Sequence, residues 1–165
     1  MCFCLCSPQT TYKSNRAVLE DLIKEHFYDT QIPMDRLIKM VRRVRFKRKA
    51  EYLQSAKDRF DDILELVKGP LSNIEKRAWL VKNIKGFGMK ASSHFLRNLG
   101  AVDLSIIDTH ILKFLEKPIP RNKREYLELE NEFTKRAKEF ALTPAELDSY
   151  IWKVYSKTPW EEFFY

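Results

Sequence analysis

A lysine, a carboxylate and a glycine-rich turn lie close together in the sequence and form its most informative feature. Residues 84–90 read Ile-Lys-Gly-Phe-Gly-Met-Lys, and Asp108 follows eighteen residues after Lys90. A lysine amine is able to act as a nucleophile, and a carboxylate stabilises positive charge that develops beside it. The two side chains therefore suggest covalent catalysis next to a tight turn.

The glycines Gly86 and Gly88 indicate a hairpin between two helices. Only four glycines occur in the 165 residues, so two of them separated by one residue mark unusual backbone angles or the close approach of another group. One helical pattern ends at Ile84, a second runs from Gly88 to Leu99, and Gly100 follows where a helix C-cap is expected. Free N–H groups at the start of the second helix predict a site for an anion such as a DNA phosphate.

Helical spacing after the hairpin predicts that Lys90 points away from the core. Ala91, Phe95 and Leu99 fall on one side of the helix, and Lys90 and Arg97 lie roughly opposite. An outward lysine is usually a solvated surface charge. Its place beside an anion-binding turn favours a functional role here.

Asp108 precedes the next apolar helical stretch, so we expect it to cap that helix. Capping is compatible with catalysis, because a carboxylate held by backbone N–H groups stays ionised. It can then stabilise positive charge at C1′ of a sugar as the glycosidic bond breaks. His110 has two open roles, as a donor to a DNA phosphate or as a partly buried packing residue.

The hairpin and its surroundings resemble the helix-hairpin-helix DNA glycosylases, and most closely the second type of archaeal and bacterial 8-oxoguanine DNA glycosylase/lyases. Supporting segments are the run at 83–98, Lys-Ala-Glu-Tyr at 49–52 and Glu-Leu-Asp-Ser-Tyr-Ile-Trp at 146–152. The resemblance implies that Lys90 attacks C1′ of a flipped nucleotide while Asp108 supports the charge and the proton transfers. Loss of the base then leaves a Schiff base on Lys90, and β-elimination cuts the strand.

The same resemblance implies a monovalent cation, Na⁺ or K⁺, held by the hairpin carbonyls of Lys82, Ile84 and Phe87 and bridging to a DNA phosphate. No other cofactor is expected. An amine nucleophile must be neutral, so the site has to favour the deprotonated lysine through desolvation or nearby positive charge.

Further DNA contacts are expected near the N-terminus. Residues 5–11 look like the segment from which the wider superfamily inserts a glutamine into the duplex, so Gln9 is expected to fill the hole left by the extruded base; a plain turn residue is the alternative. A run of basic residues is expected to line the DNA groove, with a solvated face as the alternative. The run comprises Lys39, Arg42, Arg43, Arg45, Lys47, Arg48 and Lys49. The net charge of +7 suits a polyanionic partner.

Base recognition is expected from Trp152, Phe46 and Asp148. The core stripe predicted for the last helix comprises Leu147, Ile151 and Val154. Trp152 falls off this stripe, next to Asp148. In the second-type family this tryptophan position stacks on the oxidised base, and an aromatic from the loop around Phe46 covers the other face.

The C-terminus departs from the family, whose members typically end in a lysine that helps to recognise the base. This chain ends Thr-Pro-Trp-Glu-Glu-Phe-Phe-Tyr at 158–165. Its aromatic residues either replace the missing contacts or seal the core; they are Trp160, Phe163, Phe164 and Tyr165. The preferred lesion is therefore left open.

Period-2 strands are scarce, and we predict an all-α fold of about seven or eight helices in two lobes. We expect a single helix-hairpin-helix domain over 1–165, with the hairpin motif at about 77–99. Ser72 with Glu75 and Thr143 with Glu146 match capping boxes. Residues 1–5 look like the middle of a helix, and relatives carry a helical segment before it, so we expect that an N-terminal helix is missing.

All three cysteines lie at Cys2, Cys4 and Cys6, which excludes a disulfide network and a four-cysteine iron–sulfur cluster. This pattern indicates a reducing, cytoplasmic setting, and the family points to a prokaryote. No transmembrane span or signal peptide is recognised. We expect a monomer that acts on damaged double-stranded DNA without a membrane partner.

Two functions remain after this reasoning. The first is a bifunctional glycosylase and AP lyase acting on an oxidised purine, above all 8-oxoguanine. The second is a catalytically silent helix-hairpin-helix module that only binds DNA. Lys90 and Asp108 discriminate between them, because a pure binder needs neither.

Overall fold

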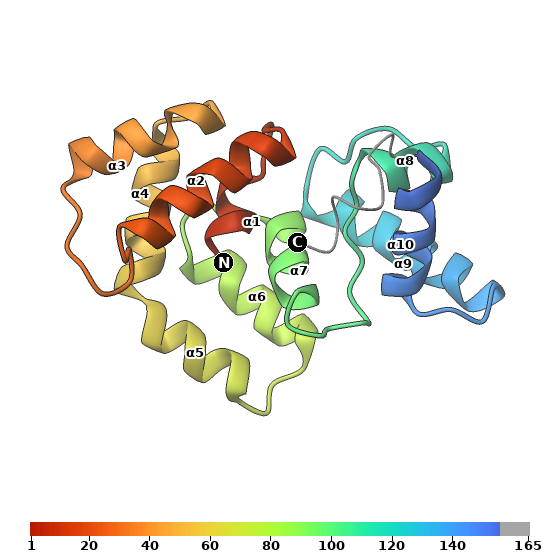
Figure 1. The fold of residues 1–165 in the computed structure, drawn as a ribbon. Helices are drawn as coiled ribbons and strands as arrows, with labels where there is room; N and C mark the ends of the chain where they lie inside the picture. The colour runs from red at the N-terminus through yellow and green to blue at the C-terminus, as the bar shows by residue number, and fades with distance from the viewer. Residues whose placement is uncertain (156–165) are drawn as a thin grey trace. The chain divides into compact units, whose positions relative to one another are not determined.

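The computed structural model describes residues 1–155, which form ten α-helices, one 3-10 helix and no strand (Figure 1). The elements are α1 (Cys2–Cys6), α2 (Tyr12–Lys24), α3 (Met34–Met40), η1 (Val41–Val44), α4 (Arg48–Asp58), α5 (Phe60–Lys68), α6 (Asn73–Asn83), α7 (Met89–Arg97), α8 (Thr109–Leu115), α9 (Lys123–Glu139) and α10 (Pro144–Tyr155). The all-α prediction is confirmed. The count exceeds seven or eight because some helices are short and because α4 and α5 are separate, with Arg59 alone between them. The expectations for Trp160, Phe163, Phe164 and Tyr165 lie outside the described residues.

The chain divides into two compact units, Met1–Phe95 and Leu96–Tyr165. The division falls within α7, so this helix contributes its first turns to one unit and its last residues to the other. In Figure 1 the first unit runs from red to green and the second from green to blue. Each unit has its own buried apolar residues.

The first unit is built around α1, which packs on α2 and α4. Four of the five residues of α1 are buried, which leaves only Phe3 half-buried. Fully buried side chains from the surrounding helices complete this core; they include Val18, Leu37, Leu53 and Leu80. Burial of these apolar side chains is the main favourable contribution to folding of the unit.

The caps predicted for the hairpin helices are present, although α7 ends at Arg97, two residues before the predicted end. The Ser72 and Glu75 side chains form the expected capping box at the start of α6. After α7, Gly100 has a φ of 99° and donates its N–H to the carbonyl of Arg97 at 2.9 Å. The Ala101 N–H donates to the carbonyl of Leu96 at 3.1 Å, which completes a Schellman C-cap.

In the second unit α10 packs on both α8 and α9. The capping box at the start of α10 is also confirmed, since the Glu146 N–H donates to Thr143 Oγ1 at 3.2 Å and Glu146 Oε2 accepts from the Thr143 N–H at 2.8 Å. Buried apolar residues of this unit include Ile111, Phe133 and Leu147.

Two residues assigned to the core by helical spacing are exposed. Leu99 is 53% exposed because α7 ends at Arg97, so Leu99 belongs to the capping turn and not to the helix. Val154 is 75% exposed, whereas Tyr155, one position later, is half-buried beneath the Lys113 ammonium at 4.6 Å from its ring centroid. The packed side of α10 therefore passes through Tyr155.

Within residues 1–155, no helix has the length and apolar character needed to cross a membrane.

Candidate active site

The two hairpin glycines occupy different environments. Gly86 has a φ of 86°, which reverses the chain so that the Phe87 N–H donates to the Ile84 carbonyl at 3.2 Å. A Cβ on Gly86 would lie 2.6 Å from Cγ and 3.0 Å from Cε2 of the Tyr52 ring. A Cβ on Gly88 would have no neighbouring atom within 4 Å. The turn thus needs glycine at 86 for its backbone and its packing, and Gly88 leaves open space at the start of α7.

Helix α7 is fixed on one side and presents Lys90 on the other. Phe95 is buried, and its ring lies 5.7 Å from that of Phe87. The buried Ser93 hydroxyl accepts a hydrogen bond from Arg77 Nη1 at 3.0 Å. Lys90 lies in the first turn of α7 and is exposed, as predicted. The amine is accessible beside helix N–H groups that have no acceptor within their own helix.

Asp108 is the N-cap of α8, as predicted. Its Oδ1 accepts hydrogen bonds from the backbone N–H groups of His110 at 2.8 Å and Ile111 at 3.0 Å. The carboxylate is therefore held by the helix that follows it. Lys90 belongs to the first unit and Asp108 to the second, so their pairing stays a prediction.

The His110 ring makes an edge contact with the ring of Trp152, at 6.2 Å between centroids and an interplanar angle of 79°. This contact supports the packing role left open for His110, and its ring is only half-buried. Trp152 is likewise half-buried. The contact links the helix that begins after Asp108 to the helix that carries the proposed stacking residue.

Asp148 is buried in an ion pair with Arg97, whose Nη2 also donates to the carbonyl of Ala145 at 3.2 Å. The Arg97 side chain is 14% exposed, so the expectation that it lies opposite the core is wrong. Burial lowers the pKa of Arg97, and the negative charge of Asp108 acts in the opposite direction. The Arg97 guanidinium thus compensates the charge of Asp148. The role in base recognition that the sequence suggested for Asp148 stays a prediction.

Two of the first-unit residues that are proposed to contact DNA lie on turns with a positive φ. Gln9 follows α1 with a φ of 55°, and Arg45 follows η1 with a φ of 73°. Phe46 is 42% exposed, and the Arg45 guanidinium lies 5.5 Å from its ring centroid. Lys47 and Arg48 are exposed at the start of α4. These positions are consistent with the proposed contacts, which stay predictions.

The basic run does not form one exposed surface. Arg43 pairs with Asp21 at 2.9 Å. Lys49 is 2% exposed, and its ammonium donates to backbone and side-chain oxygens within the protein. The expectation that Lys49 lines a DNA groove is therefore wrong. The charge of a residue does not show whether it lies on the buried or the exposed side of its helix.

Within residues 1–155, no group of three or more His, Cys, Asp or Glu side chains is arranged to hold a metal ion. The three cysteines are buried and are not joined in a disulfide within the described residues. Burial raises the pKa of Cys4 to about 11 and that of Cys6 to about 12. These thiols are therefore protonated packing residues near neutral pH.

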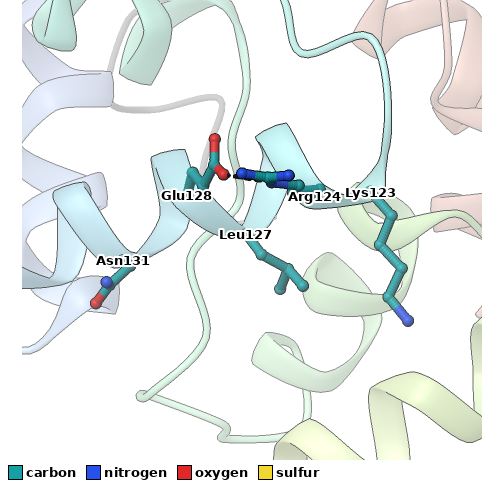
Figure 2. A pocket seen from close by; sticks show the side chains of 5 residues that line it. All are labelled: Lys123, Arg124, Leu127, Glu128 and Asn131. Carbon is teal, nitrogen blue, oxygen red and sulfur yellow. Dashed lines mark hydrogen bonds and ion pairs between the residues drawn. The ribbon is translucent and has the colours of Figure 1, made fainter.

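A surface depression in the second unit contains none of the predicted site residues. Figure 2 shows that its lining comes from one side of α9; the residues are Lys123, Arg124, Leu127, Glu128 and Asn131. Arg124 Nε donates to Glu128 Oε1 at 2.8 Å across this side of the helix. The charged groups there stabilise the helix surface as an i, i+4 pair.

Comparisons with known proteins show which family the chain resembles. Residues 1–142 match the sequence profile of the family described as 8-oxoguanine DNA glycosylase. The 8-oxoguanine DNA glycosylase/AP lyase of Methanocaldococcus jannaschii is 33% identical over 159 residues, which cover 92% of this chain and 76% of that protein. The Thermotoga maritima protein with the same description is 34% identical over 131 residues, which cover 73% of this chain and 62% of that protein.

Two solved structures have a similar fold. The crystal structure of the M. jannaschii 8-oxoguanine glycosylase/lyase in complex with a 15mer DNA containing 8-oxoguanine gives a TM-score of 0.83 at 34% identity, covering 95% of this chain and 79% of that chain. The crystal structure of the T. maritima 8-oxoguanine DNA glycosylase gives a TM-score of 0.82 at 28% identity, covering 95% of this chain and 78% of that chain.

Proposed function

The chain belongs to the 8-oxoguanine DNA glycosylase family, and from this we propose that it excises 8-oxoguanine from damaged double-stranded DNA and then cuts the strand as an AP lyase. The observation that carries the proposal is the exposed Lys90 amine at the start of α7, next to the Gly86 turn, in a chain whose residues 1–142 match the family. The function is therefore assigned to a defined nucleophile.

In the proposed reaction the neutral Nζ of Lys90 forms a bond to C1′ of the damaged nucleotide. The C1′–N9 bond breaks, and its electron pair leaves with the base, which takes up a proton. The sugar then opens by cleavage of C1′–O4′: O4′ keeps the electron pair and takes up a proton, while the lone pair of Lys90 Nζ forms the double bond to C1′ of a protonated Schiff base. Removal of a C2′ proton expels the 3′ phosphate and cuts the strand.

Asp108 supports this sequence by its charge and by proton transfer. Its Oδ1 already accepts two backbone N–H groups, so the carboxylate is held without help from substrate. A fixed anion of this kind favours the cationic character that C1′ acquires as the base leaves.

The remaining contacts position the DNA. The start of α7 binds a phosphate, Gln9 fills the space left by the flipped nucleotide, and Trp152 and Phe46 stack on the base. The exposed Arg45, Lys47 and Arg48 add phosphate contacts. His110, whose ring is half-buried, is available to donate a hydrogen bond to a DNA phosphate.

A monovalent cation at the hairpin is part of the same proposal. The Ile84 carbonyl accepts the Phe87 N–H at 3.2 Å, and a carbonyl oxygen keeps a second lone pair for another partner. The backbone oxygens of Lys82, Ile84 and Phe87 fit a hard monovalent ion, which would bring positive charge to a bound phosphate. Its test is duplex binding in K⁺ compared with tetramethylammonium at equal ionic strength, where weaker binding in the larger cation is expected.

The proposal also assigns the place of action. The substrate is cytoplasmic DNA of a prokaryote, and one copy of the chain suffices, because each proposed role is supplied once by its own residues.

Borohydride trapping tests the proposed function. Reduction converts the Schiff base into a stable covalent complex, so duplexes containing 8-oxoguanine, an abasic site or undamaged guanine are compared. We expect trapping on the first two and its loss in Lys90→Gln, with duplex binding largely kept. Lys68→Gln, which removes another exposed lysine of the first unit, is the matched control and should trap normally.

Two results would change the assignment. Trapping on the abasic duplex alone would keep the lyase step and remove 8-oxoguanine as the substrate. Binding without trapping on any duplex would overturn the enzyme and support the silent DNA-binding module.

A further inference from the structure

The ammonium group of Lys49 has three partners within one short segment. Its Nζ donates to the carbonyl of Cys6 at 2.7 Å, to the carbonyl of Pro8 at 2.8 Å and to Thr10 Oγ1 at 2.9 Å. A lysine ammonium carries three N–H donors. All of its hydrogen-bonding capacity is therefore used on the turn between α1 and α2.

This turn carries Gln9 between two of the three acceptors. Gln9 is exposed and has a φ of 55°, a left-handed conformation that side chains rarely adopt without support. The Thr10 N–H also donates to the Ser7 carbonyl at 3.1 Å. Lys49 thus supplies part of the hydrogen bonding that holds the turn from which the Gln9 side chain is exposed.

The same ammonium group lies beside Phe46. The distance from Lys49 Nζ to the Phe46 ring centroid is 5.7 Å, which is within the range of a cation–π contact. The Lys49 N–H donates to the Phe46 carbonyl at 3.1 Å, so the backbone of Phe46 is bonded to the first turn of α4. One buried side chain is therefore in contact with both the turn of Gln9 and the ring of Phe46.

Burial of the Lys49 ammonium has an energetic cost. A buried ammonium loses its hydration, and burial accordingly lowers the pKa of Lys49. Carbonyl oxygens compensate this loss without a paired carboxylate. An apolar side chain of similar length would avoid the loss of hydration, but it would leave the three oxygens without the donor that orients them.

We propose that Lys49 is a positioning residue that sets Gln9 and Phe46 in their working arrangement before DNA binds. Gln9 would then enter the duplex and Phe46 would cover the flipped base without further ordering of either segment. Ordering these groups in advance removes an entropic penalty from base extrusion. The inference rests on the proposed function and on the parts given there to Gln9 and Phe46.

The test compares two reactions that differ in their need for base extrusion. Lys49→Met is assayed in single turnovers on a duplex with 8-oxoguanine and on a duplex with an abasic site, which has no base to extrude or cover. We expect base release to slow roughly tenfold, as for loss of a stacking contact, while cutting of the abasic duplex changes less than about threefold. A fluorescent base analogue beside the lesion should report less unstacking in the variant.

A double-mutant cycle tests whether Lys49 acts through Gln9. If it does, Lys49→Met should have a much smaller effect on base release in a Gln9→Ala background. Additive effects would refute a link between the two residues. Thr10→Val removes one acceptor and keeps the lysine, so it should act in the same direction with a smaller effect even if Lys49→Met fails to fold.

Ile63→Ala is the control for a general loss of stability, because Ile63 is buried in α5 of the same unit. It should affect the two reactions equally. Equal slowing of both reactions in Lys49→Met and Thr10→Val would overturn the inference and leave Lys49 a structural residue. An inactive wild-type protein would overturn the proposed function first, and this inference with it.

Discussion

Replacement of each hairpin glycine by alanine distinguishes the contribution of the turn to protein stability from its contribution to DNA binding. Gly86→Ala places a Cβ at a φ of 86°, which costs about 1–2 kcal/mol for a left-handed L-residue. The new atom also meets the Tyr52 ring at 2.6 Å from Cγ. Rotation of the Tyr52 ring does not move its Cγ atom, so the whole side chain has to shift. This displacement adds about 1–3 kcal/mol, typical of an overpacked site.

The expected loss in free energy of unfolding is therefore about 2–5 kcal/mol. For a chain of this size each kcal/mol lowers the melting temperature by roughly 2–4 °C, so Gly86→Ala should melt about 4–20 °C below the wild type. Gly88→Ala adds its Cβ to open space and should melt within about 2 °C of the wild type, because surface changes of this kind have small effects. It should nevertheless weaken duplex binding, since the added methyl group lies where a phosphate would approach.

Thermal unfolding followed by circular dichroism and duplex binding by fluorescence anisotropy measure the two effects. In a Tyr52→Ala background the overlap is gone, and Gly86→Ala should lose only the backbone contribution of about 1–2 kcal/mol. Equal melting temperatures for Gly86→Ala and Gly88→Ala would refute the argument, since the packing against Tyr52 would then have no energetic weight.

Three other measurements address the second unit and the cysteines. Asp148→Asn leaves Arg97 buried without its charged partner, so urea unfolding should show a loss of roughly 3–5 kcal/mol; a fully stable variant with altered base preference would restore Asp148 to base recognition. Trp152→Ala should weaken binding of 8-oxoguanine duplex by about 1–3 kcal/mol relative to undamaged duplex, and equal losses on both duplexes would place the ring in packing alone. The pKa values of Cys4 and Cys6 are raised by burial from 9.0 to about 11 and 12, so the stability that they contribute is complete below pH 9 and is lost as the pH rises towards those values. Each thiol should account for a loss of about 1 kcal/mol between pH 8 and pH 10, and a Cys4→Ala/Cys6→Ala protein with an unchanged pH dependence would contradict this assignment.

Local signals along the chain predicted the helix boundaries well. Asp108 caps α8 and Gly100 ends α7 because both interactions involve residues a few positions apart. The exposed position of Lys90 followed from the same short-range spacing. Such features depend on the backbone of one helix and require no knowledge of the fold.

Contacts between distant segments were not predictable from spacing. Lys49 looked like one more surface charge, yet its partners lie 39 to 43 positions earlier in the chain. Asp148 is compensated by Arg97, 51 positions away. Helical spacing would still have offered one signal, because Lys49 and the apolar Leu53, four positions apart, lie on the same side of the helix.

The three cysteines lie on a single five-residue helix of the first unit, and the sequence contains no others. Because a buried thiol reacts with a labelling reagent only when its surroundings open, the rate of labelling measures opening of the first unit alone. Tryptophan fluorescence reports on the second unit over the same time course once Trp79, which lies in the first unit, is replaced by Phe. The natural cysteines thus report on opening of the first unit without an engineered thiol, and the single change Trp79→Phe allows the second unit to be followed separately.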